Sequence, residues 1–198
     1  MEAPATCLPS VSQVYLFLAR CFAYPKGVFY RLLKDEGSPG RVTVMAEGLP
    51  FPVTIKGIAA PELPPEELES VYINAFDMGF GPSLPCPLYE SAHREDTSSR
   101  DITEELLRFY DHFDVKLSEE ERDYPDHLGV ELEFMAFLAK KEADAANRGN
   151  DPTPYRLAQV DFLERHLDKW VCTLDDRIQK TIEGPFYRGA SSFLRELL

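Results

Sequence analysis

An acid and an imidazole, Asp126 and His127, stand directly before a strongly apolar stretch that runs over residues 128–138. Polar groups gather at helix starts because the first backbone N–H groups lack partners within the helix, and because the positive end of the helix dipole attracts carboxylates. Pro125 suits a first helical turn, since proline has a fixed helical φ and no N–H to satisfy. The apolar residues of 128–138 cover more than one narrow stripe, which predicts a central helix packed on several sides.

His127 and Glu131 are spaced i, i+4 and therefore share one face of this predicted helix. They could form a hydrogen bond or supply two metal ligands. A metal site needs three or four ligands, and the HExxH spacing is absent. The other histidines are isolated in the sequence: His93, His112 and His166. A structural pair is therefore favoured, with no metal and no cofactor, and a small metal-dependent helical enzyme that uses His127 and Glu131 stays as an alternative.

The composition is that of one acidic globular domain over residues 1–198, with a net charge of −13 and a pI near 4.7. Excess negative charge argues against a nucleic-acid partner and favours basic peptides. The four cysteines show no CxxC spacing, which indicates free thiols in the cytoplasm. The start of the chain lacks the pattern of a secretory signal, and no stretch approaches the ~20 apolar residues of a membrane span. We therefore expect a cytoplasmic protein without an integral membrane segment.

Apolar residues at helical spacing, with prolines, acids and capping residues at the starts, predict a series of helices along the chain. They cover about 10–24, 28–34, 64–79, 98–113, 126–148, 152–170, 174–182 and 186–197. At the start of the fourth, Ser98 with Asp101 three residues on resembles a capping box. No well-patterned strand occurs, so the prediction is an all-α, single-domain helical bundle.

Two parts of this pattern carry more specific expectations. The helix over 152–170 should bury one apolar face, formed by Leu157, Val160, Leu163, Leu167 and Trp170. The segment 37–64 contains helix breakers at its start and prolines among its apolar residues, so it is predicted to be irregular, with a short helix or irregular cover.

The loop over 81–91 has three prolines in six positions, Pro82, Pro85 and Pro87, and cannot be helical. Long loops in compact domains are often functional, which makes this one a candidate wall of a binding site. Aromatic and polar residues at helix ends and in this loop would suit a groove for an apolar peptide with a basic end: Tyr72, Phe76, Tyr89, Glu90, Asp126, His127 and Glu131. The alternative is that the three aromatic residues simply belong to the core.

Several of these segments resemble one family. The segment PDHLGVELEFMAFL, from Pro125, and the segment QVDFLERHLDKWV, from Gln159, resemble the TorD/DmsD/NarJ family of redox-enzyme maturation chaperones. The first carries the signature Pro-Asp-His, three residues, Glu-Leu. The YxxxF pattern of Tyr72 and Phe76 and the P-x-Y-E-S pattern at 87–91 also match, so the resemblance covers about 68–170.

The resemblance implies an all-helical cytoplasmic chaperone without catalytic turnover. Such proteins bind the twin-arginine signal peptide, or its N-terminal remnant, on the apo catalytic subunit of a molybdopterin oxidoreductase until its cofactor is inserted. The implied peptide-binding residues are the signature residues Pro125, Asp126, His127, Glu131 and Leu132, and the groove candidates Tyr72, Phe76, Tyr89 and Glu90. Asp126 and His127 are the strongest candidates for peptide contact. A permanent structural assembly subunit is a further alternative, and a homodimer is left open.

Overall fold

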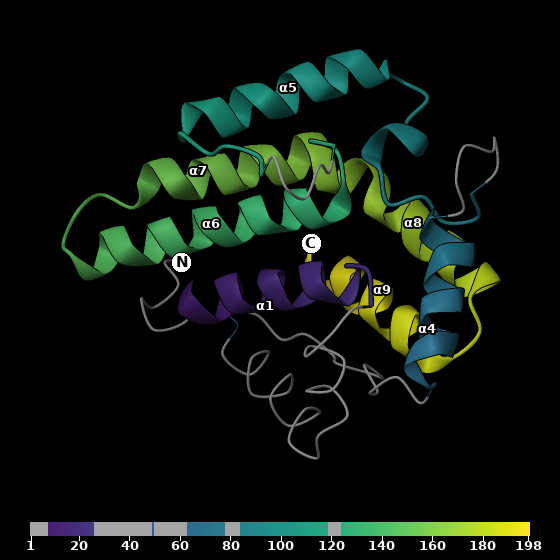
Figure 1. Ribbon diagram of the computed structural model, residues 1–198. Coiled ribbons are helices and arrows are strands. Elements are labelled where there is room, and N and C mark those ends of the chain that lie inside the picture. The colour runs from purple at the N-terminus through teal and green to yellow at the C-terminus, as the bar shows by residue number, and fades with distance from the viewer. Residues whose placement is uncertain (1–7, 26–48, 50–62, 78–83, 119–123) are drawn as a thin grey trace.

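The computed structural model describes residues 8–25, 49, 63–77, 84–118 and 124–198, and these form helices joined by loops, without a strand. Figure 1 shows α5, α7, α6 and α1 lying side by side in a stack, with α8, α9 and α4 at one end. The elements are α1 (Leu8–Cys21), α4 (Pro65–Tyr72), η1 (Ile73–Asp77), η2 (Glu90–Ala92), α5 (Ser99–His112), α6 (Leu128–Asn147), α7 (Thr153–Phe162), η3 (Leu163–Leu167), α8 (Asp168–Thr181) and α9 (Pro185–Leu197). The predicted all-α fold is confirmed.

The helix α6 is central, as its sequence predicts. It packs against α1 on one side and α7 on the other. Its side chains Leu128, Leu132, Met135 and Leu138 are fully buried. Ser12 of α1 donates its hydroxyl to the backbone carbonyl of Ala136 at 2.9 Å, which ties the two helices together at a buried point.

The start of α6 differs from the prediction. The helix begins at Leu128, so Pro125 and Asp126 precede it rather than form its first turn. His127 is the N-cap: its backbone is extended, and its Nδ1 accepts the N–H of Gly129 at 3.1 Å. A Cβ at Gly129 would lie 3.1 Å from that nitrogen, so glycine leaves room for the capping ring. His127 stays extended because it pairs with Tyr89 of the preceding loop.

The helix α7 also differs from the prediction. Leu157 and Val160 are 63% and 47% exposed, whereas Leu167 and Trp170 are fully buried. The reason is η3, a π-helical turn between α7 and α8 that holds one residue more per turn than an α-helix. Residues before η3 therefore do not share a face with residues after it, although the sequence reads as one amphipathic helix.

Four predictions fall partly or wholly outside the described residues: the helix over 28–34, most of the irregular segment 37–64, the end of the helix over 64–79, and the start of the loop over 81–91. The single domain over 1–198 stays a prediction. Among the described helices, none combines the length and apolar composition needed to span a bilayer.

The side chain of Ser98 caps the start of α5. Ser98 Oγ accepts the N–H of Asp101 at 3.1 Å, as the capping pattern of the sequence predicts. Replacing Ser98 by Ala should lower the free energy of unfolding by about 1 kcal/mol, because one helix N–H loses its partner. The neighbouring exposed Ser99→Ala is the control, with an expected change within about 0.5 kcal/mol. Urea titration followed by circular dichroism measures both, and equal losses would contradict the capping role.

Candidate functional site

A groove of about 1050 Å³ lies between α1, the α4–η1 turn and the first half of α6. Its walls are rich in aromatic side chains: Tyr24, Tyr72, Phe76, Tyr89, Tyr110, Phe134 and Phe137. Concave sites with apolar and aromatic walls and a few polar groups are the usual form of ligand sites. The size and lining of this groove make it the candidate binding site.

The aromatic floor of the groove is held between three helices. Tyr72 donates its hydroxyl to the backbone carbonyl of Phe22 at 3.2 Å, just after α1. Its ring lies 5.3 Å from that of Tyr24 and 5.2 Å from that of Phe76. Phe76 in turn contacts Tyr187 of α9, with ring centroids 5.1 Å apart. Tyr72 and Phe76 are therefore fixed in the wall of the groove, where both are buried.

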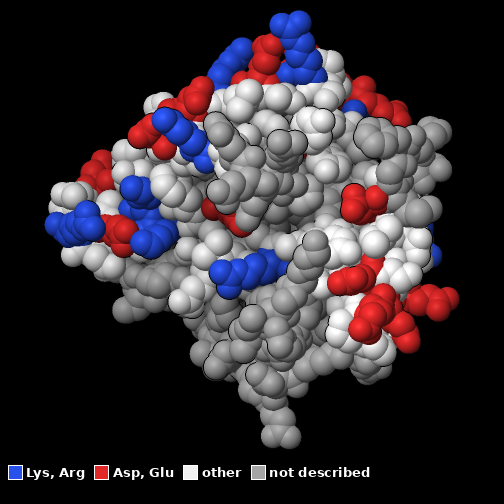
Figure 2. All heavy atoms as spheres, viewed as in Figure 1, with Lys and Arg blue, Asp and Glu red and all other residues white. Residues whose placement is uncertain are grey.

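The charges of the groove are of both signs. Among the described residues, Arg20 and Lys116 line it together with Asp77 and Glu133. The helix α4 leads into the groove through Tyr72. Glu66 and Glu67 in its first turn are exposed, and Glu69 in the next turn is partly exposed. Figure 2 shows acidic side chains gathered over the position that α4 has in Figure 1. One end of the groove therefore lies beside a negatively charged surface.

A second wall comes from the proline-rich loop and the start of α6. Tyr89 and His127 form an isolated antiparallel bridge, flanked by two backbone hydrogen bonds. Glu90 N–H donates to the Asp126 carbonyl at 2.9 Å, and Leu128 N–H donates to the Leu88 carbonyl at 2.8 Å. The rings of Tyr89 and His127 meet edge to face, with centroids 5.2 Å apart. The backbone pairing thus places both rings on the groove.

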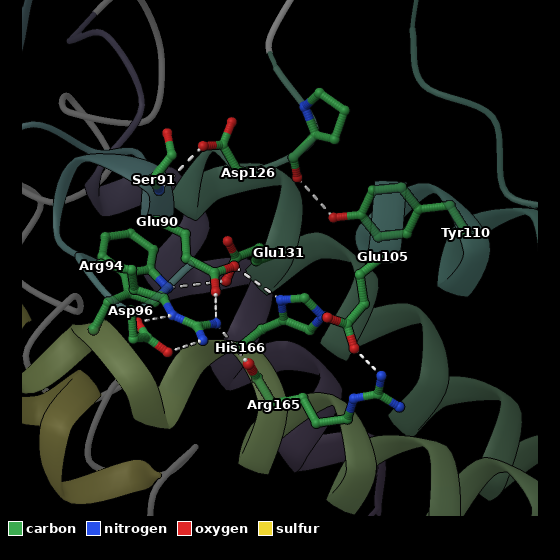
Figure 3. A network of polar contacts seen from close by, with 12 residues as sticks. Glu90, Ser91, Arg94, Asp96, Glu105, Tyr110, Asp126, Glu131, Arg165 and His166 are labelled. Carbon is green, nitrogen blue, oxygen red and sulfur yellow. Dashed lines mark hydrogen bonds and ion pairs between the residues drawn. The ribbon is translucent and has the colours of Figure 1, made fainter. Parts of the chain in front are cut away.

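A set of buried polar residues lies behind this wall, and we call it the polar cluster: Glu90, Arg94, Asp126, Glu131 and His166. Glu90 is fully buried, and its carboxylate accepts from Arg94 at 2.7 Å and from His166 at 2.9 Å. Asp126 accepts the N–H of Ser91 at 3.2 Å. In Figure 3 the side chains of Glu90, Glu131 and His166 converge from three separate elements. The cluster joins the loop to α6 and to η3.

Glu131 differs from Glu90 because its described hydrogen bonds include no basic partner. Its Oε2 accepts from the indole N–H of Trp170 at 3.3 Å, and its side chain is fully buried. Burial raises the pKa of Glu131 well above its usual value, and the charges of Glu90 and Asp126 act in the same direction, against the hydrogen bond from Trp170. Glu131 therefore holds its proton to a higher pH than an exposed glutamate does.

The structure divides the nine predicted site residues into two groups. Four line the groove: Tyr72, Phe76, Tyr89 and His127. The other five are not among the lining residues: Glu90, Pro125, Asp126, Glu131 and Leu132. Burial does not separate the two groups, because eight of the nine are buried and Tyr89 is partly exposed. Leu132 belongs to the core, and the Pro125 carbonyl accepts the hydroxyl of Tyr110 at 2.8 Å. The signature of the sequence thus marks both the wall and its support.

Sequence reasoning missed two members of the polar cluster, Arg94 and His166. Arg94 stands four residues after Glu90, an ion-pair spacing that the short turn η2 makes effective. His166 lies inside the segment QVDFLERHLDKWV that supports the family resemblance, which was the available signal. The sequence alone gives no reason to pair it with a residue 76 positions earlier.

The hypothesis of a metal site at His127 and Glu131 gains no support from the geometry. In the described part of the chain, no group of three or more His, Cys, Asp or Glu side chains is arranged to hold a metal ion. His127 uses Nδ1 to cap α6, and Glu131 accepts from Trp170. Both side chains thus serve the local structure.

The helical arrangement is that of a known class of proteins. A solved structure from Archaeoglobus fulgidus, described as a candidate redox enzyme maturation protein, matches 94% of this chain and 90% of its own, with a TM-score of 0.52 and 21% identity. This likeness concerns the fold. Residues 46–175 match the family described as nitrate reductase delta subunit, and the chain belongs to that family. The resemblance seen in the sequence is confirmed.

Named relatives agree with the family. The chain is 40% identical to the selenate reductase assembly chaperone protein of Thauera selenatis and 38% identical to the chlorate reductase assembly chaperone protein of Ideonella dechloratans. Each match covers 84% of this chain and 76% of the relative. The dimethyl sulfide dehydrogenase assembly chaperone protein of Rhodovulum sulfidophilum is 32% identical, over 84% of this chain and 68% of its own.

The raised pKa of Glu131 predicts a pH-dependent contribution to stability. The folded state holds the proton more tightly than the unfolded chain, so this contribution is present below the unfolded pKa, near 4.3, and is lost as pH rises through the raised folded pKa. Glu131→Gln keeps a neutral side chain of the same shape and should lack this loss. Urea titrations at several pH values should show wild type losing stability relative to Glu131→Gln as pH rises. Parallel curves for the two proteins would contradict a proton on Glu131.

Proposed function

We propose that this protein is an assembly chaperone that binds the N-terminal signal segment of a molybdopterin oxidoreductase catalytic subunit in the groove. The observation that carries the proposal is an aromatic groove beside an acidic helix, in a chain whose relatives are named assembly chaperones of such oxidoreductases. The chaperone would hold the apo subunit until its cofactor is inserted and would release it before export.

The groove suits both parts of such a ligand. A twin-arginine leader has guanidinium groups followed by an apolar run. The apolar run would lie against the aromatic walls, where burial of apolar area supplies affinity. The guanidinium groups would meet the acids of α4, and the net charge of −13 would speed the encounter with a basic leader. Charge would orient the ligand, and apolar area would hold it.

The nine proposed site residues act in two ways in this proposal. Tyr72, Phe76, Tyr89 and His127 would contact the peptide, because they line the groove. Asp126 would act through its hydrogen bond to Ser91, which holds the loop in place, rather than by touching the peptide. Glu90, Pro125, Glu131 and Leu132 would support the wall from behind.

The remaining parts of the proposal concern location and partners. We place the protein in the cytoplasm, where the apo subunit is made, and assign it no catalytic turnover and no cofactor of its own. Its partners would be the signal peptide and the apo catalytic subunit, without nucleic acid, and a homodimer is compatible with this role.

A charge in the groove should weaken peptide binding. Val130 of α6 lines the groove and is partly exposed, so Val130→Asp would place a carboxylate against the apolar run of the ligand. We expect affinity for a synthetic peptide with two arginines and an apolar run to fall by about tenfold or more. Calorimetry measures the affinity, and thermal melting checks the fold.

The matched control is Leu157→Asp, which makes the same change in charge on the exposed face of α7, away from the groove. It should leave peptide affinity within about twofold of wild type. Equal weakening by both variants would mean that general charge, not the groove, governs binding.

A second experiment tests the assembly role in cells. The tagged chain should capture the catalytic subunit of an oxidoreductase from cells that cannot make the molybdopterin cofactor, and Val130→Asp should capture less. Because a chaperone leaves its client after assembly, the chain should be absent from the purified mature enzyme. A stoichiometric amount in the mature enzyme would instead identify a permanent assembly subunit.

A further inference from the structure

We propose that His166 is a positioning residue of the groove: its hydrogen bond to the Glu90 carboxylate fixes Tyr89, and through the Tyr89–His127 pairing it fixes the second wall. The inference rests on the proposed function of the groove. It assigns a role to a histidine that lies outside the sequence signature at 125–132 and that does not line the groove.

The contact between His166 and Glu90 is direct and buried. His166 Nδ1 lies 2.9 Å from Glu90 Oε2, and both side chains are fully buried. Because a carboxylate oxygen only accepts, Nδ1 carries the proton of this hydrogen bond. The other ring nitrogen, Nε2, is buried and has no hydrogen-bond partner among the described residues. The imidazole therefore makes one polar contact in this part of the chain, and that contact goes to the loop.

The surroundings of His166 show that packing alone does not require an imidazole. Its ring lies 5.0 Å from that of Phe162 and 5.6 Å from that of Phe109. An apolar side chain would fit this aromatic setting without leaving a nitrogen unpaired, and a buried unpaired polar atom costs about 1–3 kcal/mol. What the imidazole adds is its hydrogen bond to Glu90.

A second contact ties the loop to the same turn of η3. Arg94 donates to the Glu90 carboxylate at 2.7 Å, and the same nitrogen, Nη1, donates to the backbone carbonyl of Arg165 at 3.1 Å. Two consecutive residues of the π-helical turn, Arg165 and His166, thus hold the loop through Arg94 and Glu90. A π-helical turn interrupts the regular hydrogen-bond ladder, and such turns are frequent at functional sites.

The hydrogen bond between His166 and Glu90 acts on the groove through the peptide bond that joins Glu90 to Tyr89. Glu90 directly follows Tyr89, and its own N–H is bonded to the Asp126 carbonyl. His166 of η3 holds the Glu90 side chain, and the Asp126 carbonyl holds the Glu90 backbone. These two contacts together fix the position of the adjacent Tyr89. Tyr89 then meets the edge of the His127 ring. Removal of the His166 contact leaves the buried Glu90 with Arg94 as its one remaining basic partner and frees the wall to shift.

Three substitutions separate this role from simple packing. In His166→Asn the side-chain amide nitrogen takes roughly the place of Nδ1 and keeps the donor. His166→Gln places its amide near Nε2 instead, and His166→Phe keeps the ring but removes the donor. We expect near-normal peptide affinity in His166→Asn and about tenfold weaker affinity in the other two, by calorimetry with the twin-arginine peptide. A packing role would instead favour His166→Phe.

A second measurement does not depend on peptide binding. The ring signals of His127 in the NMR spectrum of the free protein report its distance from the Tyr89 ring. They should move in His166→Gln and His166→Phe and stay in place in His166→Asn. Unmoved signals in all three variants would overturn the inference, whatever their affinities. If the wild type does not bind the peptide, the proposed function fails, and the His127 signals alone decide the positioning role.

Discussion

The short antiparallel pairing between residues 88–90 and 126–128 is the contact on which the candidate site depends. It joins a proline-rich loop, which has no regular structure of its own over 84–89, to the start of the central helix. The pairing uses backbone groups of both segments, and the side chains of Tyr89 and His127 line the groove. The same extended backbone explains why α6 begins at Leu128 and takes His127 as its cap.

Burial of the charged groups in the polar cluster is energetically unfavourable. Their hydrogen-bond partners reduce this cost. Glu90 is matched by Arg94 and His166, and Asp126 by the N–H of Ser91. Breaking one partner of a buried charge is strongly destabilising, whereas a complete set fixes one arrangement of the chain. Burial raises the pKa of Glu131, so this carboxyl becomes charged only at a higher pH than an exposed glutamate does. The wall therefore rests on a set of contacts with one good geometry, which suits a surface that must recognise a leader sequence.

The sequence predicted the parts of the fold that depend on neighbours along the chain. Apolar spacing identified α6 as central, and the Ser98 pattern identified the cap of α5, because both rest on local geometry. The nine predicted site residues lie at the groove wall or directly behind it, but their division into these two groups did not follow from the sequence, because pairing between distant segments decides which side chains reach the groove. The π-helical turn was missed for a related reason: η3 shifts the phase of the helix, so Leu157 and Val160 face solvent in a pattern that reads as one continuous stripe.

The π-helical turn also has a consequence for how this helix tolerates change in length. It holds one residue more than an α-helical turn would, and removal of a single residue between 163 and 167 would let α7 and α8 merge into one regular rod. Side chains on the two sides of the deletion would then rotate relative to each other by about a quarter turn. Such a deletion would leave a regular helix. It would nevertheless rotate the His166 imidazole away from the Glu90 carboxylate and turn Leu157 and Val160 from solvent toward the interior.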